Sequence, residues 1–185
     1  MNNKYIYWWF KNVFSPNEIK KLNKKVKNNV VDEQDNPASA TKNTSVSPVD
    51  PRSIKELDKV YEHIYEANKE NFGYNLYDYH TERKNFINYN VYDSIKKGEY
   101  KYHSDGMYTH HSSDIKLTAI LNLSLNKYEG GDFYINAFGQ EEIVECINTP
   151  GHLVVFPSWF LHKVTPVTKG ERISLSMWIK GPKLK

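Results

Sequence analysis

The chain has 185 residues, of which 39% are hydrophobic and 25% charged, enough for one globular domain with a sizeable core. Its formal net charge of only +3 argues against nucleic acid or an anionic membrane as partner. The single cysteine, Cys146, excludes an intramolecular disulfide, and no stretch approaches the ~20 apolar residues of a membrane span. We therefore expect a single domain over residues 1–185 in the cytoplasm, or in the host cytoplasm if the chain is phage-encoded.

A strand and a capped helix are expected near the N-terminus. Residues 5–13 are rich in aromatic side chains, which favour strands. Ser15 can then cap a helix that has Pro16 at its first position, and Glu18 completes a capping box. Apolar residues at three- and four-residue spacing carry this helix to about residue 27.

A second helix follows a long polar segment. Residues 28–49 are rich in Ser, Thr and Asn, and we expect a loop there with one short strand at about residues 40–46. Asp50-Pro51 then opens a helix whose apolar stripe ends before Gly73. The two helices would form a helical support over about residues 1–75 that packs against a sheet.

Beyond about residue 76, short runs of β-branched and aromatic residues alternate with Gly and Pro turn signals. Two helices followed by a series of antiparallel strands predict an α+β chain built on a β-sandwich or jelly roll. We place that jelly-roll core at about residues 76–182, with Cys146 as a small apolar residue of a strand. The predicted strands are residues 76–80, 84–92, 100–103, 116–125, 131–136, 141–146, 152–156, 162–167 and 172–179.

Two histidines and one aspartate form a candidate metal site. His103 and Asp105 are two positions apart, so a strand that ends there projects both side chains to one face. His162 can return from a later strand to complete two imidazoles and one carboxylate, a ligand set that holds non-haem Fe(II) and leaves positions open. His111 and Asp114, which follow in a polar loop, stay open as residues near the mouth of this site. The sequence has no HExxH motif and no cysteine-based zinc spacing.

An arginine is expected to point into the predicted barrel. Polar or aromatic residues alternate with aliphatic ones over residues 172–179, so Arg172, Ser174 and Trp178 share one face. If the aliphatic face packs on an outer layer, the guanidinium is buried and needs an anion. The carboxylate of a dicarboxylate co-substrate, gripped by Arg172 with help from the Ser174 hydroxyl, would supply that anion.

The turn over residues 166–171 joins the two parts of this candidate site. We expect it to close a hairpin, which would place Arg172 on the strand next to that of His162. Lys169 is an alternative cation for the co-substrate, although its position beside Gly170 favours exposure to solvent.

Several motifs in the second half of the chain are shared with one enzyme family. They are Asn90-Val91-Tyr92, Gly98-Glu99-Tyr100, His103-Ser104-Asp105, Leu117-Thr118-Ala119, Tyr128-Glu129-Gly130-Gly131-Asp132, Phe156-Pro157-Ser158 and the run from Leu161 to Arg172. Through these motifs, residues 87–182, about half of the chain, resemble the prolyl 4-hydroxylase-like 2-oxoglutarate/Fe(II) dioxygenases. The resemblance is greatest to bacterial PKHD-type hydroxylases and their phage relatives.

The resemblance implies a double-stranded β-helix flanked by helices. It implies that His103, Asp105 and His162 bind Fe(II), and that Arg172 binds the distal carboxylate of the co-substrate 2-oxoglutarate. Ascorbate is a further candidate ligand.

The resemblance also implies a lining for the co-substrate pocket. Tyr92 matches a tyrosine that lines this pocket in the family, and Trp178 matches a tryptophan near its metal end. Asn122 stands where many relatives carry a tyrosine that contacts the same carboxylate. Either Asn122 itself or Ser174 or Tyr92 would then complete the anchor.

The expected activity is hydroxylation of an unactivated C–H bond with release of succinate and carbon dioxide. By resemblance, the substrate is a prolyl residue of a peptide or protein, while a free amino acid or small metabolite stays open. Tyr100, Tyr102 and Tyr108 are candidates for a substrate wall. The alternatives are a non-catalytic jelly-roll module with a structural metal and a cupin-like metalloenzyme that does not use 2-oxoglutarate.

Overall fold

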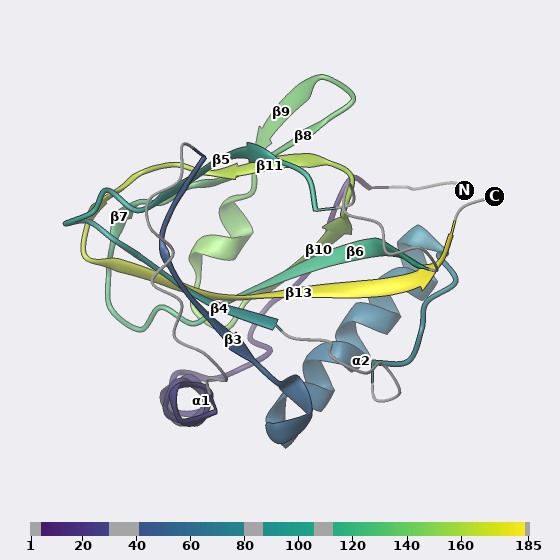
Figure 1. The fold of residues 1–185 in the computed structure, drawn as a ribbon, viewed down its shortest axis with the longest axis horizontal. Coiled ribbons are helices and arrows are strands. Elements are labelled where there is room, and N and C mark those ends of the chain that lie inside the picture. Colours follow the sequence, from purple (N-terminus) through teal and green to yellow (C-terminus); the bar gives the residue numbers. More distant parts are fainter. Residues whose placement is uncertain (1–4, 30–40, 80–86, 106–112, 184–185) are drawn as a thin grey trace.

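Three layers stack on one another in this computed structural model, which describes residues 5–29, 41–79, 87–105 and 113–183. Two helices cover one face of a six-stranded antiparallel sheet, and a five-stranded antiparallel sheet lies on its other face (Figure 1). The predicted α+β class with a jelly-roll core is confirmed. Tyr108 and His111, considered above, lie outside the described residues, as do residue 80 and residues 84–86 of two predicted strands.

The two sheets are built from strands that are far apart in the sequence. The six-stranded sheet has the order β1-β10-β6-β13-β4-β3, formed by β1 (Trp8–Phe10), β3 (Ser45–Val49), β4 (Ile87–Asp93), β6 (Ser113–Asn122), β10 (Leu153–Pro157) and β13 (Glu171–Pro182). The five-stranded sheet has the order β2-β5-β11-β8-β9, formed by β2 (Lys42–Asn43), β5 (Glu99–His103), β8 (Phe133–Ala137), β9 (Gln140–Ile143) and β11 (Leu161–Val164). A two-stranded ribbon of β7 (Glu129–Gly130) and β12 (Val167–Lys169) lies at one end of the sandwich.

Helix α1 (Pro16–Asn28) begins as predicted. The Ser15 hydroxyl accepts a hydrogen bond from the Glu18 backbone N–H, and the Glu18 carboxylate accepts one from the Ser15 backbone N–H at 2.8 Å. These bonds confirm the capping box. They also lower the pKa of Glu18 to about 2.

The second helix is shorter than predicted. Asp50 accepts a hydrogen bond from the Arg52 N–H, as expected of a cap. Ile54, however, has φ −128° and ψ 87°, which lies outside the helical region and separates two 3-10 turns, η1 (Pro51–Ser53) and η2 (Lys55–Leu57). The α-helical part is α2 (Asp58–Ala67), followed by the π-helical turn η3 (Asn68–Phe72).

Three strand predictions need correction. The short strand expected at residues 40–46 is instead split into β2 and β3, and Pro48 fits β3 because this strand lies at a sheet edge. Residues 76–79 form no strand, although the Tyr77 N–H donates to the Lys180 carbonyl at 2.8 Å. Cys146 is a half-buried residue of the 3-10 turn η4 (Glu145–Asn148) and not a strand residue.

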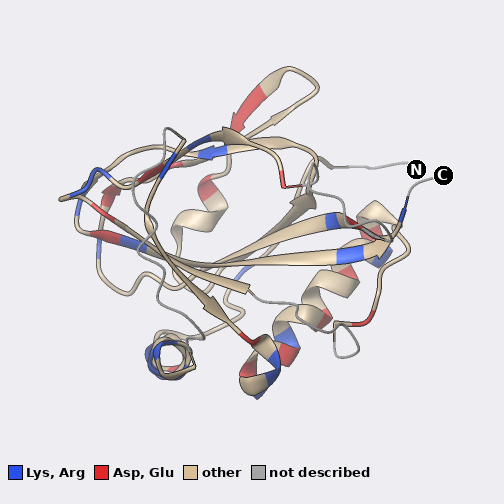
Figure 2. Ribbon diagram, viewed as in Figure 1, with Lys and Arg blue, Asp and Glu red and all other residues tan. Residues whose placement is uncertain are grey.

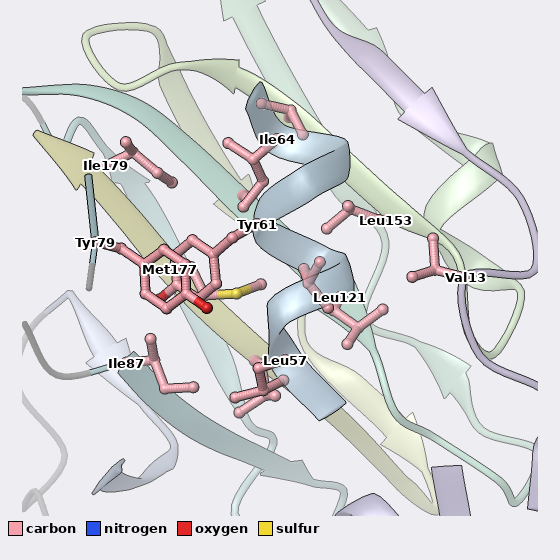
Figure 3. Packing of buried hydrophobic residues seen from close by; sticks show 14 of the residues in the cluster. Val13, Leu57, Tyr61, Ile64, Tyr79, Ile87, Leu121, Leu153, Met177 and Ile179 are labelled. Atoms are coloured by element: carbon pink, nitrogen blue, oxygen red, sulfur yellow. The ribbon is translucent and has the colours of Figure 1, made fainter. Parts of the chain in front are cut away.

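Two hydrophobic clusters fill the two spaces between the layers. In the first, α2 lies over side chains of β6, β10 and β13, including Leu121, Leu153 and Met177 (Figure 3). The second lies between the sheets and includes Phe133 and Phe156. Because strand residues alternate, the residues of β13 that do not face the helices must face the other sheet.

Charged residues of both signs occur on α2 and on strands of both sheets (Figure 2). This mixture is consistent with the small net charge of +3. In the described part of the chain, no helix has the length and apolar character that crossing a bilayer requires.

Replacing Ser15 with alanine should lower the free energy of unfolding by about 1 kcal/mol, because the acceptor for the Glu18 N–H is lost. Urea denaturation at neutral pH measures this change. The control is Lys20→Ala at an exposed position of the same helix, which should stay within about 0.5 kcal/mol of the parent protein. An equal loss in both variants would contradict the capping role.

The contribution of Glu18 should depend on pH. Its pKa is lowered in the folded protein from the ordinary value of 4.5 to about 2, so its stabilisation is complete above 4.5 and is lost as the pH falls toward 2. The stability difference between the parent protein and Glu18→Gln should therefore be constant above pH 4.5 and shrink below it. Urea denaturation across this range provides the test, and a difference that grows at low pH would contradict it.

Candidate metal centre

The three predicted ligand side chains converge at the end of β5. His103 is the last residue of this strand and lies opposite His162 of β11 in the antiparallel register. Asp105 follows the strand, and its backbone N–H donates to the Ser158 carbonyl at 2.9 Å. One ligand atom from each of the three side chains lies within 4.8 Å of the others.

Both imidazoles present an unprotonated nitrogen to the carboxylate. Nδ1 of His103 lies 2.9 Å from the Lys101 carbonyl oxygen, and Nδ1 of His162 lies 3.0 Å from the Phe160 carbonyl oxygen. Since a carbonyl only accepts, each Nδ1 carries the proton and each Nε2 carries a lone pair. The two Nε2 atoms lie 3.7 and 3.5 Å from the oxygens of Asp105. Three acceptors that face one another in this way fit a cation between them.

The contacts between these histidines and the aspartate are not ion pairs. Burial, and then the neighbouring His162, lowers the pKa of His103 to about 4. Burial also lowers the pKa of His162, against the opposing effect of Asp105. Both rings are neutral at pH 7, which is the form that binds metal.

Thr118 orients the carboxylate from the opposite sheet. Its hydroxyl donates to Asp105 Oδ2 at 2.8 Å. The sequence motif contains Thr118, but nothing in the motif indicates this contact. The alternation of strand residues could have indicated it, because Thr118 lies on the face of β6 opposite to the residues that pack toward the helices.

A cavity of about 120 Å³ opens onto the three candidate ligands. The predicted residues Tyr92 and Trp178 line it, as do Asn90 and Ser176, which no sequence pattern singled out. Tyr100 also lines the cavity and stacks on His103 with ring centroids 3.4 Å apart.

Lys42 is a further residue that lines the cavity. The sequence placed it only in the polar segment before the second helix and indicated no role at the site. The Lys42 ammonium lies 4.6 Å from the centroid of the Tyr100 ring. The two residues lie opposite each other in the antiparallel pair of β2 and β5. Burial lowers the pKa of Lys42 to about 8, while Asp105 acts in the opposite direction.

Arg172 is the largest side chain that the structure buries almost completely, with 1% exposed. Its Nη1 donates to Ser174 Oγ at 3.3 Å, but Nε and Nη2 have no hydrogen-bond partner in residues 5–29, 41–79, 87–105 and 113–183. The guanidinium carbon lies 5.5 Å from the centroid of the Tyr92 ring. Burial raises the pKa of Tyr92 to about 12, so its hydroxyl stays protonated. Two unused donors on a buried guanidinium fit the carboxylate of a ligand.

The predicted hairpin between His162 and Arg172 is wrong. Strand β11 belongs to the five-stranded sheet and β13 to the six-stranded sheet. The residues between them form β12, and the N–H of Val167 donates to the Gly98 carbonyl at 2.9 Å. The candidate metal ligands and Arg172 therefore approach the interior from facing sheets and not from neighbouring strands.

Lys169 does not replace Arg172 as the cation. Its side chain is 73% exposed, and its Nζ lies 2.9 Å from Glu129 Oε1. This surface ion pair agrees with the solvent exposure expected at that turn.

The Asn122 amide is bound to backbone. Its Nδ2 donates to the Ile147 carbonyl at 2.8 Å, and its Oδ1 accepts from the Ser124 N–H at 2.8 Å. Both polar ends of this buried side chain are thus used. A role for Asn122 in co-substrate binding stays a prediction that no contact supports.

Two other candidates lie away from the cavity. Asp114 pairs with the buried Lys116 at 3.1 Å and is not a lining residue. Tyr102 is exposed and hydrogen-bonds to Glu141. Of the tyrosines proposed as a substrate wall, the described residues place only Tyr100 at the cavity.

Known proteins resemble this chain in both sequence and fold. Residues 87–180 match the 2OG-Fe(II) oxygenase superfamily. A PKHD-type hydroxylase of Shewanella oneidensis is 45% identical over 79 residues, which is 42% of this chain but only 32% of that relative, so the match spans about a third of its length.

Solved structures extend the likeness to nearly the whole fold. A prolyl-4-hydroxylase of Pseudomonas putida superposes with a TM-score of 0.71 at 20% identity, covering 96% of this chain and 94% of that one. A prolyl hydroxylase from Trichoplax adhaerens, solved with a peptide fragment of a hypoxia inducible factor, gives a TM-score of 0.65 at 12% identity, covering 94% and 83%. At these identities the likeness establishes the fold.

Replacing Thr118 with valine should weaken metal binding by about tenfold or more, because the hydrogen bond that orients Asp105 is lost without a change of shape. Anaerobic equilibrium dialysis with Fe(II) measures this affinity. The control is Thr165→Val, which removes a hydroxyl bonded to the Asp132 N–H at 2.8 Å. Equal affinities for Thr118→Val and the parent protein would contradict the orienting role.

Proposed function

The chain belongs to the 2OG-Fe(II) oxygenase superfamily, and on that premise we propose that it hydroxylates an unactivated C–H bond of its substrate. In the reaction, substrate, molecular oxygen and 2-oxoglutarate yield hydroxylated substrate, succinate and carbon dioxide. One oxygen atom enters the new hydroxyl group and the other enters succinate. The observation that carries the proposal is the pairing of three convergent acceptors with a buried guanidinium that has two unused donors.

His103, Asp105 and His162 would hold Fe(II), with two neutral nitrogens and one carboxylate oxygen. Bound iron supplies the activation of oxygen that is coupled to oxidation of the co-substrate. The chain supplies orientation. The Nδ1 hydrogen bonds fix both imidazoles, and Thr118 fixes the carboxylate.

Arg172 would bind the distal carboxylate of 2-oxoglutarate through two parallel N–H donors. Ser174 holds the remaining edge of the guanidinium. Tyr92, a protonated phenol whose ring centroid lies 5.5 Å from the guanidinium carbon, and Trp178, which also lines the cavity, would border the co-substrate. Burial of these groups excludes water from the bound acid and strengthens each polar contact.

The substrate we propose is a prolyl residue of a peptide or protein. Support comes from two proteins of similar fold, the prolyl-4-hydroxylase of Pseudomonas putida and the prolyl hydroxylase of Trichoplax adhaerens, the second of which was solved with a peptide. A free amino acid or small metabolite is the second candidate. Incubation with proline-rich peptides, followed by a search for a mass gain of one oxygen atom, tests the first of these.

Anaerobic titration with Fe(II) and 2-oxoglutarate tests the cofactor assignment. A visible charge-transfer absorption is expected when the keto acid chelates the iron. Absence of this absorption would favour a module with a structural metal, and its persistence without 2-oxoglutarate would favour a metalloenzyme of another type.

Asp105→Ala should abolish succinate formation, because a metal ligand is lost. Arg172→Ala should raise the 2-oxoglutarate requirement by at least about thirtyfold, since loss of a buried charged partner costs about 2 kcal/mol or more. Succinate release at varied 2-oxoglutarate measures both effects. Glu145→Gln, at an exposed carboxylate, should leave both unchanged. Undiminished succinate formation in Asp105→Ala would refute the proposed metal site.

A further inference from the structure

We propose that Tyr128 is an additional binding residue for 2-oxoglutarate, whose distal carboxylate accepts a hydrogen bond from the Tyr128 hydroxyl beside the Arg172 guanidinium. The inference rests on the proposed function and extends it. Tyr128 lies in the segment between β6 and β7 and begins the motif Tyr128-Glu129-Gly130-Gly131-Asp132, for which the sequence indicated no ligand contact.

The Tyr128 hydroxyl is a buried polar group without a partner. Its oxygen is shielded from solvent, and it forms no hydrogen bond within the part of the chain that the structure describes. A buried hydroxyl left without a partner is destabilising, so native proteins seldom keep one without a use. Arg172 Nε and Nη2 share this condition.

The two side chains meet at Gly131. A Cβ atom added to Gly131 would lie 3.0 Å from Arg172 Cδ and 3.5 Å from Tyr128 Cε2. Cε2 is bonded to the carbon that carries the hydroxyl, so the polar end of the ring lies close to the Gly131 position that Arg172 Cδ also approaches. Gly131 has φ +67°, which favours glycine, and an added Cβ would also lie 3.0 Å from Val167 Cγ2, so only a residue without a side chain fits between these three neighbours.

A carboxylate satisfies the three unused donors together. Nε and Nη2 form one edge of the guanidinium, and their parallel N–H groups match the two oxygens of a carboxylate. Each oxygen keeps a further lone pair, which the phenol O–H can reach as a third donor. Ser174 occupies the opposite edge through Nη1. Asn122 provides no competing donor, because its amide is bound to backbone.

Another tyrosine supplies a matched control. The hydroxyl of Tyr89 is also buried without a partner in the described residues, but its ring packs in the hydrophobic cluster next to the helices. Tyr89→Phe and Tyr128→Phe therefore each remove one shielded hydroxyl that has no partner among the described residues. Of these two tyrosines, Tyr128 is the one that approaches Arg172, at Gly131.

Two keto acids separate the distal carboxylate from the rest of the ligand. 2-Oxovalerate keeps the keto-acid end and the five-carbon chain of 2-oxoglutarate but carries a methyl group in place of the distal carboxylate. Isothermal titration of each acid into the Mn(II)-loaded protein measures binding without turnover. Tyr128→Phe should raise the Kd of 2-oxoglutarate about tenfold, as expected for one hydrogen bond to a charged group, and should leave the Kd of 2-oxovalerate unchanged.

Other results of these measurements would overturn either the role of Tyr128 or the proposed function. Equal weakening of both acids in Tyr128→Phe, or an unchanged Kd for 2-oxoglutarate, would overturn the inference. Thermal unfolding without ligand adds a second readout: Tyr128→Phe should unfold no earlier than the parent protein, as Tyr89→Phe should, because neither hydroxyl has a partner to lose. If the parent protein binds no 2-oxoglutarate with Mn(II), the proposed function itself fails.

Discussion

Arg172 carries a positive charge into the interior of the sandwich, where no carboxylate of the described residues forms an ion pair with it. An isolated buried charge costs several kcal/mol, so the rest of the fold must hold this side chain in place. Strand β13 does so from the middle of the six-stranded sheet, between β6 and β4. Leu175 and Met177 on its other face pack beneath the helices, and their burial offsets part of the cost. The helices thus stabilise the strand that carries Arg172 without lining the cavity.

The two sheets divide the chemistry between them. The five-stranded sheet supplies the two imidazoles through β5 and β11, whereas the six-stranded sheet supplies Arg172 and the threonine that orients Asp105. The lone pairs of the two imidazoles therefore lie on one wall and the guanidinium donors on the other. A metal cation would bind the lone pairs at one end, and the distal carboxylate of a chelating dicarboxylate would bind the guanidinium at the other. The separation of the two ends is set by the spacing of packed sheets, about 10 Å, and not by a local turn.

Local patterns in the sequence predicted the local features. Ser15 and Glu18 identified the helix start, and alternation along β13 placed Arg172 on the interior face. The strand pairing was harder, since the chain crosses between sheets after β11, where turn residues alone suggested a hairpin. Lys42 and Tyr100 are far apart in the sequence, and only strand pairing brings them together. An unused donor on Tyr128 is likewise visible only when its three-dimensional surroundings are known.

Strand β2 lies at the edge of the five-stranded sheet, so changes in it leave the centre of the sheet in place. His162 lies on the central strand of the five-stranded sheet, whereas Lys42 is attached at the rim through a strand of only two residues. Substitutions or insertions near β2 would change the cavity lining at Lys42 while β5 and β11, which carry the two imidazoles, keep their pairing with each other. The cavity lining at this edge and the arrangement of the two imidazoles can therefore change independently of each other.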